Sequence, residues 1–284
     1  MALLGSCWTA VTWLYGFDDN YGSAMRFVEL FAGIGGFSLG FERVGMECVG
    51  HVEIDPYAQK VLLKHWPDVP LLPDVTKIKG DEFGKVELLC GGFPCQDLSV
   101  LGKQAGITGA RSGLFDEIIR IARVCRPEFI VLENVANLIA RPDWFGYVLG
   151  RLAQIGYDAE WEIIRAWNFG LPHSRARVFI VAYPGSQFRS NRCIQSKDSG
   201  NINVRWENEK VRCYDRKFFK MESFTLQRLG EEWEKGNSEP GILRISNGLP
   251  HQLDRLKCLG NSLIPQIAEY IGKQILNTFQ KEKK

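Results

Sequence analysis

Residues 26–44 read RFVELFAGIGGFSLGFERV, and this stretch decides the fold. Arg26–Leu30 is typical of a short buried strand, and the glycine-rich turn Phe31–Gly36 follows it directly. The pattern then predicts a helix over Phe37–Val44. Glycines allow a backbone to approach a ligand closely, and a helix that begins at such a turn presents its N-terminus to negative charge. This order of elements suits a nucleotide-like ligand.

Strand–helix units of the same kind recur along the chain. We predict further strands at Cys48–Glu53, Val86–Cys90, Phe129–Glu133 and Val178–Tyr183, and helices over Pro56–His65, Leu114–Arg126 and Asn261–Phe279. Strands that alternate with helices and are apolar on both faces indicate a doubly wound α/β sheet.

Composition excludes several classes of protein. The chain has 284 residues, of which 45% are hydrophobic and 24% charged, so it is neither disordered nor fibrous. A net charge of +2 is only mildly basic and does not by itself indicate a nucleic-acid binder. The eight cysteines include no C-x-x-C pair, which argues against a zinc site or a disulfide scaffold and favours a reducing compartment, here the cytoplasm.

The chain divides into four parts. Residues 1–17 carry no charged side chain, but they fall short of the roughly 20 apolar residues that a spanning helix needs. We interpret 1–24 as a non-essential N-terminal extension with Met25 as the natural start; a membrane-surface anchor is the alternative. Residues 25–183 form the α/β core, 184–250 a polar insert, and 251–284 a segment that returns to the core.

Two acids follow the glycine turn at informative positions. Glu53 ends the second strand, 17 positions after Gly36, where a carboxylate accepts hydrogen bonds from ribose hydroxyls. Asp74 comes at the next turn and suits an adenine amino group. The dinucleotide-binding fingerprint is not satisfied, because Ser38 stands where its third glycine belongs. The spacing favours an adenosine cofactor, and a structural role for these groups is the alternative.

A second constellation follows the strand that ends at Cys90. Cys95 sits in the constrained turn Gly91–Gln96, where an open α/β fold places reactive groups. The alternative is a cysteine packed as a small hydrophobe, which fits Cys90 better.

One acid and one pair of arginines can each be interpreted as functional groups or as ordinary surface residues. Glu133 ends the apolar strand Phe129–Glu133 and is either a functional acid or an acid exposed at the strand end. Arg175 and Arg177 alternate before the last strand, so they share a face. They are either a site for phosphate or carboxylate recognition or a solvated pair.

Five blocks, in this order and spacing, resemble those of DNA (cytosine-5) methyltransferases: Phe27–Gly36 the S-adenosylmethionine turn, Gly92–Gln96 the nucleophile motif, Glu133–Val135 the acid motif, Arg175–Arg177 the double-arginine motif, and Gly260–Ser262 the closing block. The resemblance covers about residues 26–183 and 255–275. It implies a Rossmann-like, S-adenosylmethionine-dependent fold with a mixed sheet. His173 replaces the usual glutamine before the arginines, and Ile264 is an added residue in the closing block.

The resemblance assigns roles residue by residue. The implied catalytic residues are Cys95, Glu133, Arg175 and Arg177. The implied cofactor-binding residues are Phe31, Gly33, Ile34, Gly35, Gly36, Glu53, Ile54, Asp74, Val75, Gly92, Pro94, Leu114, Asn261 and Ser262. The implied substrate-binding residues are Gln96, Ser99, Lys103, Arg111, Asn134 and Arg244. No metal is expected.

These residue types suit one reaction. A Cys95 thiolate adds to C6 of cytosine and makes C5 nucleophilic, while Glu133 at N3 disperses the charge that accumulates. The cytosine must first leave the duplex, and the glycine-spaced loop Asp97–Gly113 is expected to close over it.

The polar insert 184–250 is expected to be the target recognition domain. Residues 189–220 contain nine Lys and Arg against four Asp and Glu, which suits phosphate contacts; a solvated charged surface is the alternative. Arg244 and Asn247 are candidates for base contacts. We expect a monomer that binds double-stranded DNA and does not bind a membrane. A cognate restriction endonuclease that acts separately is left open.

Other readings stay open. A tRNA cytosine methyltransferase on the same fold is one alternative. By resemblance, that branch would have Pro-Pro-Cys at the nucleophile and a Cys-Phe-Thr motif elsewhere. Here Phe93 precedes Pro94, and no Cys-Phe-Thr occurs. A catalytically silent DNA-binding relative would have lost Cys95 or Glu133, and both are present. A nicotinamide oxidoreductase is the most distant alternative, because Ser38 breaks its fingerprint.

Overall fold

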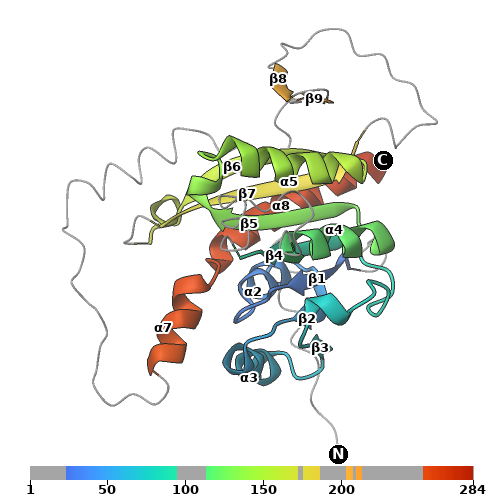
Figure 1. Ribbon diagram of the computed structural model, residues 1–284. Coiled ribbons are helices and arrows are strands. Elements are labelled where there is room, and N and C mark those ends of the chain that lie inside the picture. Colours follow the sequence, from blue (N-terminus) through green and yellow to red (C-terminus); the bar gives the residue numbers. More distant parts are fainter. Residues whose placement is uncertain are drawn as a thin grey trace, which may run out of the picture.

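The computed structural model describes residues 24–94, 113–171, 175–185, 203–206, 209–212 and 252–283. Within these residues the centre is a seven-stranded sheet in the order β3-β2-β1-β4-β5-β7-β6 (Figure 1). Its strands are β1 (Arg26–Leu30), β2 (Glu47–Val52), β3 (Leu71–Leu72), β4 (Leu88–Gly92), β5 (Phe129–Val135), β6 (Tyr157–Arg165) and β7 (Ala176–Pro184). A separate antiparallel pair consists of β8 (Asn203–Trp206) and β9 (Glu209–Arg212).

The helices of the described residues connect these strands. They are α2 (Gly36–Glu42), α3 (Pro56–His65), α4 (Gly113–Cys125), α5 (Pro142–Gln154), α7 (Gln252–Asn261) and α8 (Pro265–Lys283). Three short 3-10 helices are η1 (Val75–Lys77), η3 (Ala136–Leu138) and η4 (Ala166–Phe169).

The sheet is mixed, and its strand order reverses next to β1. β3, β2, β1, β4 and β5 run parallel, whereas β7 is antiparallel to both β5 and β6. The chain continues from β1 to β2 on one side, while β4 pairs with β1 on the other side. In open α/β sheets, ligands bind at such a reversal, outside the carboxyl ends of the strands. The fold therefore places a candidate site at the ends of β1 and β4.

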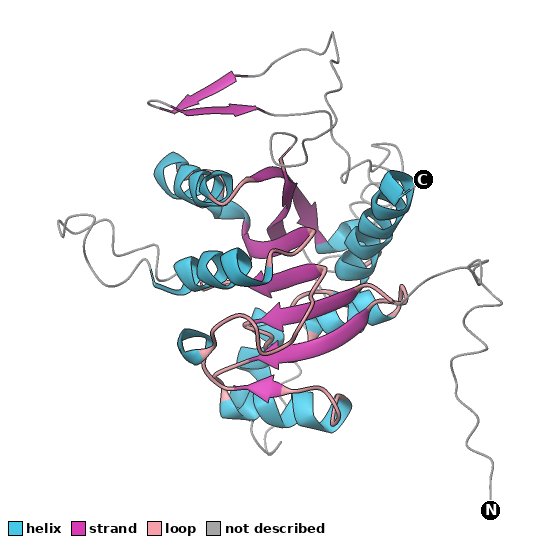
Figure 2. Cartoon of the chain, turned by 90° about the vertical axis from the view of Figure 1, so that its right-hand side faces the viewer, coloured by secondary structure: helices cyan, strands magenta, loops and turns pink. Residues whose placement is uncertain are grey.

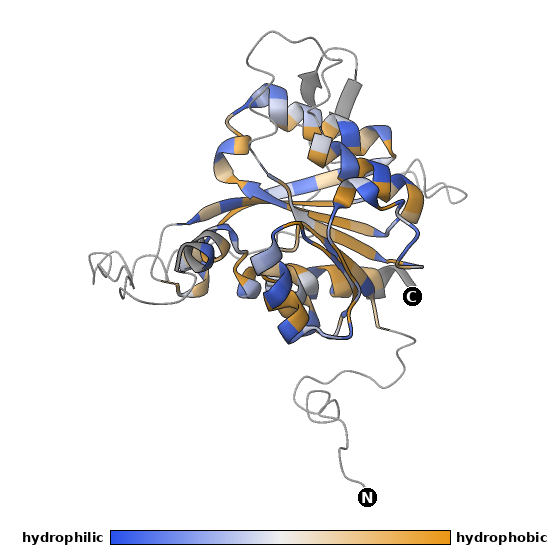
Figure 3. Cartoon of the chain, turned by 60° about the horizontal axis from the view of Figure 1, so that its bottom comes forward, coloured by the Kyte–Doolittle hydropathy of each residue, from blue (hydrophilic) through white to orange (hydrophobic). Residues whose placement is uncertain are grey.

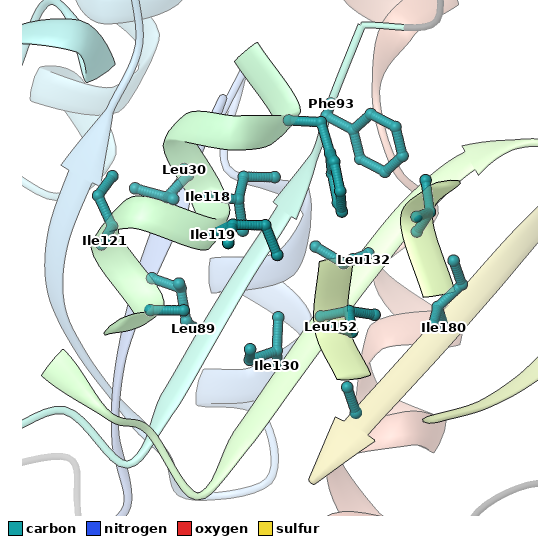
Figure 4. Packing of buried hydrophobic residues seen from close by; sticks show 14 of the residues in the cluster. Leu30, Leu89, Phe93, Ile118, Ile119, Ile121, Ile130, Leu132, Leu152 and Ile180 are labelled. Atoms are coloured by element: carbon teal, nitrogen blue, oxygen red, sulfur yellow. The ribbon is translucent and has the colours of Figure 1, made fainter. Parts of the chain in front are cut away.

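Both faces of the sheet are buried, as the sequence predicted. Alternate residues of a strand face opposite sides. One face packs against α4 and α5 through a cluster that includes Leu30, Leu89, Ile118, Ile130 and Leu152 (Figure 4). The opposite face packs against α2 and α8 through a second cluster that includes Phe27, Phe41, Leu88, Phe129 and Ile271. Helices accordingly flank the sheet on both sides (Figure 2), and the central strands are hydrophobic (Figure 3).

The prediction of one helix over Asn261–Phe279 is wrong. Asn261 is the last residue of α7, and α8 begins only at Pro265. Proline disfavours helical backbone in the residue before it but is well suited to a first helical position, so it separates the two helices. The closing segment (Gly260–Ile264) spans this break.

The sequence analysis did not predict β3, α5, β6 and α7, nor the pair β8 and β9 and the three 3-10 helices. β6 lies at the edge of the sheet and shows no strict alternation of buried and exposed residues, because charged side chains interrupt it. The remaining predicted strands and helices are present, with boundaries that differ by up to two residues.

Within the described ranges, every helix is too short or too polar to cross a lipid bilayer. Residues 1–23 of the predicted extension lie outside these ranges, as does most of the insert 184–250.

The contact between α2 and α8 depends on a residue without a side chain. A Cβ at Gly40 would overlap the Cβ of Ala268 and the carbonyl oxygen of Pro265. We expect Gly40→Ala to lower the free energy of unfolding by about 1–3 kcal/mol, because overpacking a well-filled contact forces the two helices apart. Urea unfolding followed by tryptophan fluorescence measures this change.

The matched control is Gly150→Ala in α5, where the added Cβ meets no atom within 4 Å. This substitution is expected to leave stability unchanged or to raise it by up to about 1 kcal/mol, because alanine is the better helix former. Equal effects of the two substitutions would contradict the packing argument.

Candidate active site

Four strands bring the predicted site residues to one edge of the sheet. The glycine turn (Phe31–Gly36) follows β1 and lies beside the end of β4. On the other side of β4, Gly92 lies opposite Glu133 of β5. β7 runs in the opposite direction, so its first residues reach the same edge, and Arg177 lies opposite Val135.

The glycine turn has an unusual backbone. Phe31 and Gly33 have φ angles of 53° and 55°, in the left-handed region that most L-residues avoid. At Phe31 this conformation is strained, and such strain concentrates at functional sites. A Cβ at Gly36 would lie 2.8 Å from the Cβ of Leu263, so only glycine lets the closing segment pack onto the turn. Two distant blocks of sequence therefore meet here.

Glu53 holds the glycine turn from β2. One carboxylate oxygen accepts a hydrogen bond from the Gly33 amide at 2.6 Å, and the other accepts one from the Asp55 amide at 2.7 Å. The next side chain, Ile54, is 73% exposed, although it is large and apolar. Glu53 therefore lies against the glycine turn.

Asp74 and Val75 have mainly local contacts. The Asp74 carboxylate accepts hydrogen bonds from the Thr76 amide at 3.0 Å and the Thr76 hydroxyl at 2.7 Å, and so caps η1. These bonds from Thr76 are the main cause that lowers the pKa of Asp74. The Val75 side chain is buried in the core. A cofactor contact of Asp74 would use the lone pairs that these bonds leave.

Glu29 is a buried acid that the sequence analysis missed. It is 2% exposed, and its carboxylate accepts hydrogen bonds from the Phe37 amide at 3.1 Å and the Ser38 amide at 2.9 Å. An internal carboxylate thus already occupies these first-turn amides of α2, which the sequence analysis expected to face a ligand. The signal available in the sequence was an acid inside an otherwise apolar strand.

Burial shifts the titration of two groups in opposite directions. It raises the pKa of Glu29 from 4.5 to about 7, against the lowering effect of hydrogen bonds from Ser38 and Phe37. It lowers the pKa of His51 from 6.5 to about 4. Both effects arise because a low-dielectric interior disfavours the charged form.

Glu133 is the buried acid at the other side of the site. Its Oε1 lies 2.8 Å from Nε of Arg177, and its Oε2 faces Gly92, where a Cβ would lie 2.9 Å away. Burial raises the pKa of Glu133, while the positive charges of Arg177 and Arg175 act to lower it. The acid is therefore easier to protonate than an exposed glutamate.

The two arginines have different partners. Arg177 pairs with Glu133, whereas the Arg175 guanidinium donates hydrogen bonds to the Gly260 carbonyl and, at 2.7 Å, to the Ser262 carbonyl. Arg175 thus ties the closing segment to β7. The alternative of a solvated pair is wrong, because both side chains are engaged.

Asn134 positions the chain that leads to Cys95. Its amide nitrogen donates a hydrogen bond to the Phe93 carbonyl at 2.9 Å, and its side chain is buried. Phe93 is itself packed in the core beside Leu132 (Figure 4). The next residue, Pro94, is exposed.

The other predicted residues divide into two groups. Leu114 is partly buried at the start of α4, Asn261 is exposed at the end of α7, and the Ser262 hydroxyl donates to the Leu259 carbonyl. Ile34 and Gly35 complete the glycine turn. The predicted residues that lie outside the described ranges are Cys95, Gln96, Ser99, Lys103, Arg111, His173, Arg244 and Asn247. Among the described residues no group of three or more His, Cys, Asp or Glu side chains is arranged to hold a metal ion.

Comparison with known proteins gives one family. The profile described as C-5 cytosine-specific DNA methylase matches residues 25–242. The chain is 36% identical over 167 residues to the Type II methyltransferase M.BsuFI of Bacillus subtilis, covering 58% of this chain and 41% of that protein. It is 34% identical over 167 residues to the Type II methyltransferase M.HhaI of Haemophilus parahaemolyticus, covering 58% and 51%. The matches thus span about half or less of these relatives.

Solved structures share the fold. A prophage-encoded E. coli protein, proposed to be a DNA modification methyltransferase, superposes with a TM-score of 0.59 at 18% identity, covering 90% of this chain and 100% of that one. The Entamoeba histolytica methyltransferase EhMeth gives a TM-score of 0.58 at 16% identity, covering 91% and 99%. At such identities the likeness supports the fold alone.

The opposed titrations of Glu29 and His51 generate a prediction about stability and pH. Glu29, with its raised folded pKa, contributes stability that is complete below pH 4.5 and is lost as pH rises to about 7. His51, with its lowered folded pKa, contributes stability that is complete above pH 6.5 and is lost as pH falls to about 4. In the wild type the two contributions offset each other between pH 4.5 and 6.5.

We therefore expect Glu29→Gln to make the free energy of unfolding rise with pH in this window, with a limiting slope of about 1.4 kcal/mol per pH unit relative to wild type. His51→Gln should give the opposite slope. Urea unfolding at several pH values measures both. Slopes equal to that of the wild type would contradict the assignment.

Proposed function

The chain belongs to the C-5 cytosine-specific DNA methylase family, and on this premise we propose that it is a DNA (cytosine-5-)-methyltransferase acting on double-stranded DNA with S-adenosylmethionine as cofactor. The observation that carries the proposal is the placement of Glu133. This buried acid pairs with Arg177 and faces Gly92, three residues before Cys95. An acid beside a cysteine-bearing turn is what cytosine activation requires.

The residues around the glycine turn fit the cofactor. A Cβ at Gly33 would meet no atom within 4 Å, so the space above the turn is open to a ligand. The Glu53 carboxylate beside it suits ribose hydroxyls, and the exposed Ile54 offers an apolar surface to an adenine ring. S-adenosylmethionine supplies an activated methyl group on a sulfonium sulfur. Asp74, Leu114, Asn261 and Ser262 are proposed as further contacts.

Cys95 and Glu133 would share the activation of cytosine. The Cys95 thiolate adds to C6, which breaks the aromaticity of the ring and makes C5 electron-rich. Protonated Glu133 donates a hydrogen bond to N3 and disperses the negative charge. After C5 has gained the methyl group it loses its proton to a base, which we propose is water, and the electrons left behind expel Cys95 as a thiolate.

The two arginines and Asn134 would support this step. Arg177 orients the Glu133 carboxylate, and the positive charges of Arg175 and Arg177 at the site favour the thiolate form of Cys95. Arg175 also anchors the closing segment, and Asn134 holds the backbone at Phe93, two residues before Cys95. Each contact reduces the freedom of a group that has to meet the cytosine ring.

DNA binding is assigned to segments outside the core. We propose that 184–250 is the target recognition domain and that the loop Asp97–Gly113 closes over the flipped cytosine, with Gln96, Ser99, Lys103, Arg111 and Arg244 as contacts. Removal of a base from the duplex costs a few kcal/mol, which contacts of the closed loop would offset. We propose that the enzyme is a monomer in the cytoplasm. A cognate restriction endonuclease, if the cell has one, would act as a separate protein.

Cys95→Ser tests the covalent step. We expect it to abolish transfer of a tritiated methyl group to DNA while the dissociation constant for S-adenosylhomocysteine stays within about twofold of wild type, because a serine hydroxyl is a much weaker nucleophile than a thiolate. Duplex DNA that contains 5-fluorocytosine should trap the wild type as an adduct stable on a denaturing gel, and Cys95→Ser should give none. Normal turnover of the variant would refute covalent catalysis.

Glu53→Ala tests the cofactor site. We expect binding of S-adenosylhomocysteine to weaken by about 1–3 kcal/mol, because hydrogen bonds to a charged acceptor are lost. Isothermal titration calorimetry measures the change. The control is Glu47→Ala, which removes an exposed acid from the other end of β2 and should not alter binding. An unchanged dissociation constant for Glu53→Ala would remove the assignment.

A further inference from the structure

Ser38 is a buried polar residue just after the glycine turn. It is fully buried in the first turn of α2, at the position where dinucleotide-binding folds have a glycine for close packing. Its hydroxyl oxygen lies 2.5 Å from Oε2 of Glu29 and 2.8 Å from Nε2 of His51. A polar contact between helix and sheet therefore replaces the usual close apolar one, and it links β1, α2 and β2.

The proton positions in this chain of groups follow from what each atom can donate. The Ser38 hydroxyl carries one proton, and Glu29 can only accept once it is ionised, which happens above its pKa of about 7. The hydroxyl then donates to Glu29 and accepts from a protonated Nε2 of His51. This tautomer leaves Nδ1 of His51 without a proton, and Nδ1 is a buried atom that has no hydrogen-bond partner among the described residues. An unpaired acceptor is tolerated in a protein interior more often than an unpaired N–H.

The chain of hydrogen bonds ends on the backbone that shapes the glycine turn. Glu29 binds the Phe37 and Ser38 amides, which directly follow the turn. Glu53, which follows His51 by two residues in the sequence, binds the Gly33 amide inside the turn. The segment His51–Glu53 therefore contacts this backbone at two places. Glu53 binds the turn directly at Gly33, and His51 acts through Ser38, just after the turn.

We propose that Ser38 and His51 are positioning residues for the cofactor turn, acting through a directed relay from His51 Nε2–H to the Ser38 hydroxyl to the Glu29 carboxylate. The inference rests on the proposed function, because it takes S-adenosylmethionine as the ligand of the turn. Without the hydroxyl, Glu29 keeps only the two amide donors of α2, so its carboxylate is held less firmly in the orientation that fixes these amides.

The relay predicts a specific pattern of cofactor affinity. Ser38→Ala and His51→Leu should each weaken S-adenosylhomocysteine binding about tenfold, the size of one hydrogen bond to a charged group. His51→Gln should restore most of the affinity, because its side-chain amide can donate from a position close to that of Nε2. In steady-state assays with DNA, KM for S-adenosylmethionine should rise while kcat changes by less than about twofold.

Cys48→Ala is the matched control. The Cys48 sulfur lies 3.4 Å from both the Ser38 hydroxyl and His51 Nε2 in the same buried pocket, but the relay does not pass through it. This variant should bind S-adenosylhomocysteine within about twofold of wild type, although it removes a buried side chain of similar size. An effect as large as that of Ser38→Ala would overturn the relay in favour of general packing.

A spectroscopic readout tests the direction of the relay without any ligand. Nitrogen-15 NMR of the wild type at pH 8 should show neutral His51 protonated at Nε2, and Ser38→Ala should shift that signal. A proton on Nδ1 would overturn the relay. If Ser38→Ala does not fold, His51→Leu against His51→Gln and the wild-type spectrum decide.

The binding experiment separates two failures. If the wild type binds S-adenosylhomocysteine but Ser38→Ala and His51→Leu bind equally well, the positioning role is overturned and the proposed function stands. If the wild type does not bind it, the proposed function fails and the positioning role fails with it.

Discussion

Two carboxylates hold the backbone at the turn between β1 and α2, where the amides of Gly33, Phe37 and Ser38 donate to acids while those of Ala32 and Gly35 donate to backbone carbonyls. Glu53, directly after β2, binds Gly33, and Glu29 of β1 binds Phe37 and Ser38. A buried amide without a partner costs free energy, so these acids add to the backbone hydrogen bonds that stabilise the turn. The closing segment packs onto Gly36 from another side. The turn is therefore held from three sides by the protein's own contacts.

The reversed direction of β7 creates the second half of the site. Because β7 is antiparallel to β5, its first residues lie beside the end of β5, and Arg177 meets Glu133 there. A parallel strand would place its first residues at the far edge of the sheet. Arg175, two residues earlier, contacts the closing segment instead. One short sequence thus links the acid to the segment that also supports the glycine turn.

Local patterns account for most of the predicted fold. The runs around Val28, Leu89 and Ile130 are apolar on both faces, and each forms a central strand that helices cover on both sides. β6 could not be recognised this way, because Asp158, Glu160 and Glu162 interrupt its apolar pattern, although Glu160 is buried. The apolar periodicity of the last helix also continued across Pro265, and the helix break there was overlooked.

The sequence alone determined the central strands and the helices beside them, the glycine turn and the kinds of reactive side chain at the strand ends, because these depend on residues close together in the chain. Tertiary structure decided which of these side chains meet. The partner of Arg175 lies 87 residues away at Ser262, and Ser38 joins Glu29 to a histidine on another strand. Such contacts depend on strand order and direction, which local patterns do not encode.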